Sequence, residues 1–128
     1  TGAELWRLKT GGDNPIPTPF SAHGLIYVSN GHGAAAPVWA IRPGATGDIT
    51  PAAGETSSPF IAWSDQKSGI YIQTPLVYRD LLYCGSNAGI VPAFFSHASS
   101  ASPSARRAWS SRACAALVSV VRLAICAE

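Results

Sequence analysis

Hydrophobic positions in the first 91 residues fall into short runs that are separated by turn-forming residues. Residues 25–28 read LIYV, residues 38–41 read VWAI and residues 81–84 read LLYC. Glycine, proline, asparagine or serine lies close to the ends of these runs, which is the pattern of short β-strands. Residues 18–20 and 74–77 are also predicted strands, each with a proline near its start, where the missing N–H costs least. Turns at residues 22–24 and 78–80 then connect the strands into two hairpins. We therefore expect residues 1–91 to contain only antiparallel strands and no helix longer than one turn.

These hairpins belong to an internal repeat. Residues 16–33 (IPTPFSAHGLIYVSNGHG) align without gaps with residues 72–89 (IQTPLVYRDLLYCGSNAG). The identical pairs are Ile16/Ile72, Thr18/Thr74, Pro19/Pro75, Leu25/Leu81, Tyr27/Tyr83 and Gly33/Gly89. Trp6 matches Trp63 with a slip of one residue, so the period is 56 or 57 residues. Each unit is expected to supply about four short strands, as in one propeller blade, and the loop at residues 43–58 holds the extra length.

The last part of the chain has a different composition. All twelve glycines and all four aspartates lie before residue 92, and alanine, serine and arginine make up more than half of residues 92–128. Residues 1–91 carry a net charge of −1 and residues 92–128 carry +3. Three interpretations stay open: a linker with a terminal helix, a disordered tail, and translation out of frame, which we favour. We therefore divide the chain into residues 1–91 and residues 92–128, and we expect any helix within residues 113–127.

The motifs of residues 1–91 resemble those of a known repeat family. TGAELW, residues 1–6, resembles the Thr-Gly-x-x-x-Trp signature of pyrroloquinoline-quinone-type (PQQ-type) β-propeller repeats. Residues 14–30 and 71–91 resemble the blade segments that come after it, and residues 38–49 (VWAIRPGATGDI) resemble a Tyr-Ala-Ile-Arg strand that precedes a long loop. The resemblance implies an all-β fold, namely a partial β-propeller of about two incomplete four-stranded blades from a larger protein. It also implies that Trp6 and Trp63 are structural residues that dock between neighbouring blades.

The resemblance ends after Val91. The family pattern then requires a short strand, an aspartate and another Thr-Gly-x-x-x-Trp, but the chain reads PAFFSHASS, and Trp109 lacks the Thr-Gly turn. This departure is the main argument for a frame change near residue 92. Because fewer than two blades leave open strand edges, we expect the chain alone to be prone to aggregation.

Charge and cysteine usage give no support for binding to nucleic acid, to a membrane or to zinc. The net charge is +2 and only 12% of residues are charged, so nothing indicates binding to nucleic acid or to an anionic membrane surface. The apolar run at residues 113–121 is too short to span a bilayer. Cys84, Cys114 and Cys126 lack the spacing of a zinc site. The resemblance implies instead that the partners are other blades of the same propeller and another protein.

No residue is assigned a catalytic, cofactor-binding or metal-binding role. GHGAAA, residues 31–36, matches G-x-G-x-x-A, but Pro37 and the strand after it prevent the helix that a dinucleotide site needs. A glycine-rich hairpin turn is predicted there instead. His23 and His32 are interpreted as solvated turn residues. Asp13, Asp48, Asp65 and Asp80 are all predicted in turns, and no pattern singles out one of them.

The resemblance implies two alternative functions. The first is a non-enzymatic protein-interaction scaffold, as in the outer-membrane assembly lipoproteins of bacteria. The second is a fragment of a quinone-dependent alcohol or sugar dehydrogenase, which would need PQQ and calcium. Dehydrogenases of this family typically carry two adjacent cysteines, which this sequence lacks. Both alternatives imply a periplasmic or extracellular location, and the scaffold is the favoured one.

Overall fold

The computed structural model describes residues 2–9, 11, 13–32, 34–87 and 89–96 of the chain. Within these ranges the chain forms nine β-strands and no α-helix, which confirms the all-β prediction. The strands are β1 (Trp6–Arg7), β2 (Phe20–Ala22), β3 (Leu25–Ser29), β4 (Val38–Ile41), β5 (Gly47–Asp48), β6 (Ile61–Asp65), β7 (Leu76–Tyr78), β8 (Leu81–Tyr83) and β9 (Ala93–Phe95). The helix predicted within residues 113–127 lies outside the described residues.

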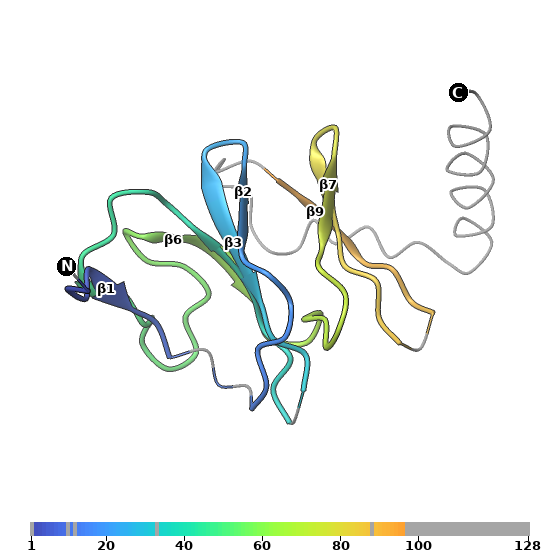
Figure 1. Ribbon diagram of the computed structural model, residues 1–128, viewed down its shortest axis with the longest axis horizontal. Coiled ribbons are helices and arrows are strands. Elements are labelled where there is room, and N and C mark those ends of the chain that lie inside the picture. Colours follow the sequence, from blue (N-terminus) through green and yellow to red (C-terminus); the bar gives the residue numbers. More distant parts are fainter. Residues whose placement is uncertain (1, 10, 12, 33, 88, 97–128) are drawn as a thin grey trace.

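The strands form three small sheets. The first sheet pairs β1 with β5, the second has the order β2-β3-β4-β6, and the third has the order β7-β8-β9. Figure 1 shows the second sheet in the middle, with β1 on one side of it and the third sheet on the other. Within the described residues, none of the three sheets closes on itself.

The hairpins β2–β3 and β7–β8 have the same register. Phe20 pairs with Tyr27 in the first hairpin, and Leu76 pairs with Tyr83 in the second, so both partners move by 56 residues. The two remaining pairs of each hairpin show the same shift. The Thr18 N–H also donates to the hydroxyl of Thr74, its counterpart 56 residues later, at 3.3 Å. The repeat read from the sequence is therefore present in the structure as a repeated hairpin.

The strand β9 continues the second unit beyond residue 91. Tyr83 pairs with Ala93, just as Tyr27 pairs with Ala40 in the first unit. The sequence VPAF at residues 91–94 thus takes the place of VWAI at residues 38–41, after a connection that is three residues shorter. The change of composition at residue 92 consequently does not coincide with the end of the sheet.

The first sheet corrects the expectation that residues 1–91 contain only antiparallel strands. Its strands run parallel, with Trp6 opposite Gly47. The strand β5 lies within the loop at residues 43–58, which has no hydrophobic periodicity. Ala45 and Ile49 on either side of β5 are buried, at 8% and 4% exposure, and they hold the loop against the second sheet. This burial brings β5 beside β1.

The second sheet is buried on both faces. One face packs against the third sheet in a cluster that includes Leu25, Tyr27 and Leu82. The opposite face packs against the first sheet and its loop in a cluster that includes Trp39 and Ile41. This explains why all four residues of β4 are buried, because the side chains of a strand alternate between the two faces.

Candidate functional site

Trp63 lies between the second and third sheets. It belongs to β6, and its ring packs 5.3 Å from the ring of Phe94 in β9 and 6.2 Å from that of Tyr27 in β3. The indole N–H is buried and has no acceptor among the described residues. An indole in this position contributes apolar contact area between two sheets.

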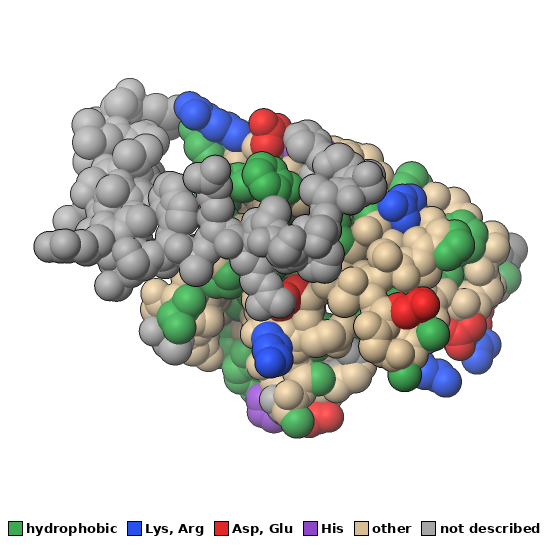
Figure 2. Space-filling view, turned by 180° about the vertical axis from the view of Figure 1, so that it is seen from behind, with side chains coloured by type: hydrophobic (Ala, Val, Ile, Leu, Met, Phe, Trp, Pro, Cys, Tyr) green, Lys and Arg blue, Asp and Glu red, His purple; other side chains and the backbone are tan. Residues whose placement is uncertain are grey.

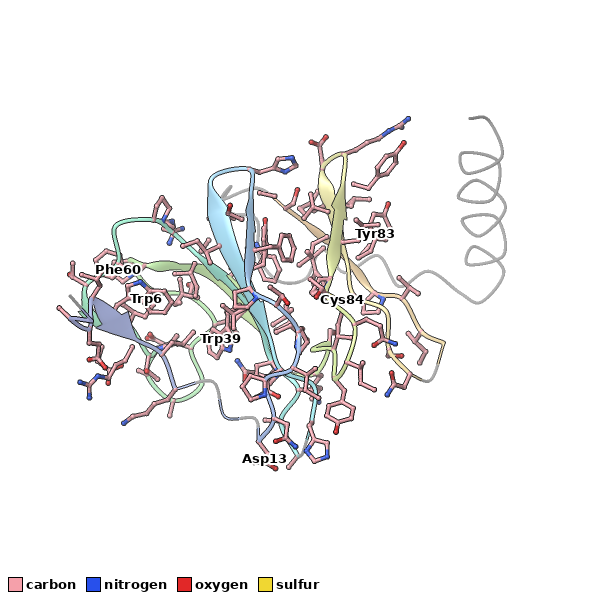
Figure 3. All side chains as sticks on the ribbon, in the orientation of Figure 1. Trp6, Asp13, Trp39, Phe60, Tyr83 and Cys84 are labelled. Atoms are coloured by element: carbon pink, nitrogen blue, oxygen red, sulfur yellow. The ribbon has the colours of Figure 1, made fainter. Side chains whose placement is uncertain are left out.

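Trp6 lies on the opposite side of the second sheet. It is half-buried in β1 and packs on the cluster that contains Trp39 and Ile61. Figure 3 shows Trp6 and Phe60 close together on this side, near the first sheet. The structure therefore places the two sequence-predicted tryptophans at separate interfaces, and it does not bring them together into one site.

A buried hydrogen-bonded junction ties the second sheet to the third. Ser96 is fully buried, and its carbonyl oxygen accepts a 2.6 Å hydrogen bond from the Tyr27 hydroxyl. Its hydroxyl is hydrogen-bonded to His23 Nδ1 at 2.6 Å, and its N–H donates to the Asp80 carbonyl at 2.9 Å. Because Ser96 has no exposed surface, it is a structural link and not a nucleophile beside a histidine. The sequence pattern marked Tyr27 only as a repeated position, and it did not single out Ser96.

The two turn histidines have defined contacts. His23 lies in the β2–β3 turn with a positive φ of 49°, exposed but hydrogen-bonded to the Ser96 hydroxyl. His32 is exposed in the connection between β3 and β4, where its ring packs 4.7 Å from that of Tyr71. The described residues of that connection contain no helix, as expected from Pro37 and the strand that follows it.

The four aspartates do not converge. Asp13 and Asp80 lie in a bend and a turn, as predicted, but Asp48 belongs to β5 and Asp65 ends β6. The prediction of turns is wrong for these two, because their strands depend on pairing with residues far away in the sequence. Hydrogen bonds from Thr50, and then the nearby Lys9 and Arg7 charges, lower the pKa of Asp48. Among the described residues, no group of three or more His, Cys, Asp or Glu is placed to hold a metal ion.

The thiol of Cys84 and the hydroxyl of Tyr27 are ionisable groups that are buried in the core between the second and third sheets. Each is 1% exposed. Burial, with a smaller contribution from the Asp65 charge, raises the pKa of the Cys84 thiol to about 12. Burial also raises the pKa of Tyr27 to about 12. Both groups are therefore neutral near pH 7, and neither is activated for chemistry.

Stability is expected to fall at alkaline pH because of these two groups. Above the unfolded-state pKa of a thiol, roughly 8.5, the unfolded chain loses a proton that folded Cys84 keeps. The free energy of unfolding then declines by about 1.4 kcal/mol per pH unit for one such proton. Tyr27 adds to the decline above about pH 10. Urea unfolding measured from about pH 7 to about pH 11 checks this, with Cys84→Ala as the control that removes the decline between about pH 9 and about pH 10. A flat profile would contradict the expected burial.

An exposed apolar face is the feature of the described residues that is best suited to binding. Leu76, Tyr78 and Phe95 are 61%, 56% and 44% exposed on the third sheet. They alternate with Val77 and Phe94, which pack toward the second sheet, so they belong to the opposite face. We call this surface, with the half-buried Leu81 and Tyr83, the outer face of the third sheet.

Contiguous exposed apolar surface commonly marks a site of protein interaction. Figure 3 labels Tyr83, the last residue of β8, and Cys84, which follows it. Consecutive residues of an extended chain point to opposite faces of a sheet. Figure 2 shows hydrophobic side chains reaching the surface in several places of the view drawn there. Because of its exposed apolar side chains, the outer face is the candidate functional site.

No helix in the described residues is long and apolar enough to cross a membrane.

A comparison with protein-family models finds none that matches this chain, and a search of characterised proteins finds no significant similarity. The resemblance to PQQ-type repeats therefore stays a prediction from the motifs.

Proposed function

We propose that this chain is a protein-interaction scaffold made of repeated β-sheet units, of the PQQ-type propeller kind, and that it has no catalytic role. The observation that carries this proposal is the repeated hairpin. Two hairpins 56 residues apart share one register, and their sheets pack against each other through apolar side chains. Repeat proteins of this kind extend by stacking similar units, and they bind partners over the surface that the stack presents.

The placement of the polar side chains supports a scaffold. His23 and Ser96, the residues that most resemble a catalytic pair, bind each other at a junction where Ser96 is fully buried. Cys84 is buried in the core, where its raised pKa keeps it protonated. The Cys84 thiol and the His23–Ser96 pair thus serve packing and sheet contacts, while Leu76, Tyr78 and Phe95 are exposed apolar side chains on the third sheet.

Titration of the full chain with PQQ in the presence of calcium separates this proposal from a quinone-dependent dehydrogenase. We expect no saturable heat of binding in isothermal titration calorimetry and no change in the absorption spectrum of the quinone. The same titration without calcium is the control. Saturable, calcium-dependent binding of PQQ would contradict the scaffold and favour the dehydrogenase.

A further inference from the structure

Asn30 and Gly31, at the end of β3, form the only Asn-Gly sequence in the chain. The side-chain amide of an asparagine can react with the backbone nitrogen of the next residue. Glycine hinders this reaction least, because it has no Cβ. Of the other asparagines, Asn14 precedes a proline, whose nitrogen carries no hydrogen, and Asn87 precedes an alanine. The Asn30–Gly31 pair is therefore the asparagine site of this chain with the highest intrinsic reactivity.

The reaction is a spontaneous deamidation in which water is the co-reactant. The Gly31 nitrogen loses its proton and attacks Cγ of Asn30, the bond between Cγ and Nδ2 breaks, and Nδ2 leaves as ammonia. Water then opens the resulting succinimide ring at either of its carbonyl groups, which yields aspartate or isoaspartate. In isoaspartate the main chain continues through the former side chain, so the backbone becomes longer by a methylene group.

The folded structure shields this pair from the reaction. Asn30 is 1% exposed, and its N–H donates to the Pro37 carbonyl at 2.9 Å. Its Oδ1 accepts a long hydrogen bond of 3.5 Å from the His32 N–H, so the side chain contacts the residue after Gly31. Ring closure requires rotation of the Asn30 side chain and backbone and access of water. A close-packed site restricts both.

The segment before β7 covers the pair. A Cβ on Gly31 would overlap the backbone of Ile70, and a Cβ on Gly69 would lie 2.5 Å from the Asn30 carbonyl oxygen. The two stretches of backbone are therefore in direct contact. The Ile70 N–H donates to Ser29 Oγ at 2.8 Å, and this hydrogen bond is buried. The segment must move away before water reaches the Asn30 amide.

Deamidation would prevent the segment from returning. Aspartate at position 30 would place a carboxylate at a buried position, and a buried charge without a partner is costly. Isoaspartate would lengthen the backbone where the Asn30 N–H pairs with Pro37 and where Gly31 meets Ile70. Nδ2 of Asn30 has no acceptor among the described residues. The cost therefore arises from the charge and the longer backbone, and not from hydrogen bonds that Nδ2 loses.

We propose that Asn30–Gly31 is a modification site controlled by the fold: it is converted to aspartate or isoaspartate when the segment before β7 detaches, and the product keeps the segment detached. Ile70 belongs to the cluster between the second and third sheets, and the segment leads into the third sheet. Each conversion consequently loosens the contact between these two sheets irreversibly. This inference does not depend on the proposed scaffold function.

Peptide mapping by mass spectrometry of the full chain tests the protection. The chain is incubated at mildly alkaline pH with and without urea, and the conversion of Asn30, Asn87 and Asn14 is followed. In urea, Asn30 should be converted faster than the other two. Without urea, its conversion should be slower by about a hundredfold or more, which corresponds to an opening free energy of about 3 kcal/mol at about 1.4 kcal/mol per tenfold change.

Two substitutions test whether the segment before β7 is the cover. Ser29→Ala removes the acceptor of the buried Ile70 N–H, and Gly69→Ala forces a methyl group against the Asn30 carbonyl. Each should accelerate both the conversion of Asn30 in the folded chain and the hydrogen exchange of the Ile70 amide, by about tenfold or more. Gly85→Ala is the control and should change neither rate, because no heavy atom lies within 4 Å of its Cβ.

The effect of the product is measured with Asn30→Asp. This variant should unfold at a lower urea concentration than the unchanged chain, and its Ile70 amide should exchange faster. Asn87→Asp is the matched control, because Asn87 is exposed, and it should leave both quantities nearly unchanged.

Three results would overturn the inference. One is conversion of Asn30 at the same rate in the folded chain and in urea, which would show that the fold does not protect it. Another is faster exchange of the Ile70 amide in Ser29→Ala without faster conversion of Asn30, which would show that the segment is not the cover. The third is an Asn30→Asp variant with the stability and the Ile70 exchange rate of the unchanged chain, which would show that the product does not keep the segment detached.

Discussion

Replacing Gly69 with alanine is expected to destabilise the protein by an amount at the upper end of the roughly 1–3 kcal/mol that overpacking a well-packed site costs. A Cβ at this position would lie 2.5 Å from the carbonyl oxygens of Asn30 and Pro37. It would also lie 2.6 Å from the carbonyl carbon of Ala36. All three atoms belong to the backbone, so a change of rotamer cannot relieve the contact.

The backbone around Gly69 has little freedom to move. The Gly69 N–H donates to the Ala36 carbonyl at 2.6 Å, and the Asn30 N–H donates to the Pro37 carbonyl at 2.9 Å. The first hydrogen bond holds the segment before β7 against the connection between β3 and β4, and the second closes that connection on itself. A Cβ at Gly31 would likewise meet the backbone of the same segment, at Ile70 and Tyr71. The two glycines therefore allow a close approach of two chain segments, and either alanine substitution would force them apart.

Gly85→Ala is the matched control for Gly69→Ala. No heavy atom lies within 4 Å of a Cβ at Gly85, and its φ is not positive. Its effect should therefore be small, or slightly stabilising, because alanine reduces the freedom of the unfolded chain. Urea unfolding followed by far-ultraviolet circular dichroism compares the two variants. Equal midpoints for both would show that the segment before β7 does not pack against the β3–β4 connection.

The two hairpins were predictable from the sequence because their information is local. An apolar run, a turn and a second apolar run lie within about a dozen residues, and the repeat shows the pattern twice. The strand β4 was predicted with its observed bounds for the same reason. The predicted strands at residues 18–20 and 74–77 begin later in the structure, at Phe20 and Leu76, because the Thr-Pro pairs before them lie outside the ladders.

Other strands depend on contacts between distant residues, and the sequence pattern did not predict them. The strand β5 consists of Gly47 and Asp48, which have no strand propensity of their own and pair because the loop around them is buried. The strand β6 joins the second sheet across the long loop from β4. The strand β9 was overlooked because composition changes at residue 92, although Ala93 fills the same buried position as Ala40.

The candidate site shows the same division. Trp6 and Trp63 were chosen as structural residues from the repeat, and the structure places them at two sheet interfaces. The outer face of the third sheet was not predicted, although Leu81 and Tyr83 lie in a recognised strand. The alternation of residues in a strand defines two faces, but only the packing of whole sheets decides which face is covered.

Trp63→Ala is expected to give the largest loss of stability, on the order of 3–5 kcal/mol, because it removes a large apolar side chain from between two sheets. The ring contacts Tyr27 in the second sheet and Phe94 in the third, so the cavity would lie where the repeat units meet. Both tryptophans are partly buried, but Trp6→Ala should cost less, because Trp6 lies in the two-stranded first sheet at the edge of the other cluster. Urea unfolding of both variants measures the difference.

Trp63→Phe separates packing from any role of the indole N–H. This N–H is buried without an acceptor among the described residues. Removing it therefore breaks no hydrogen bond to these residues, and it eliminates the cost of burying a donor without a partner. Phenylalanine keeps most of the apolar contact, so Trp63→Phe should retain most of the stability that Trp63→Ala loses. If the unfolding midpoint of Trp63→Ala instead equalled that of the unchanged protein, Trp63 would not contribute to the packing of the two sheets. The structural role would then be wrong, because a side chain that packs between two sheets cannot be removed without loosening both.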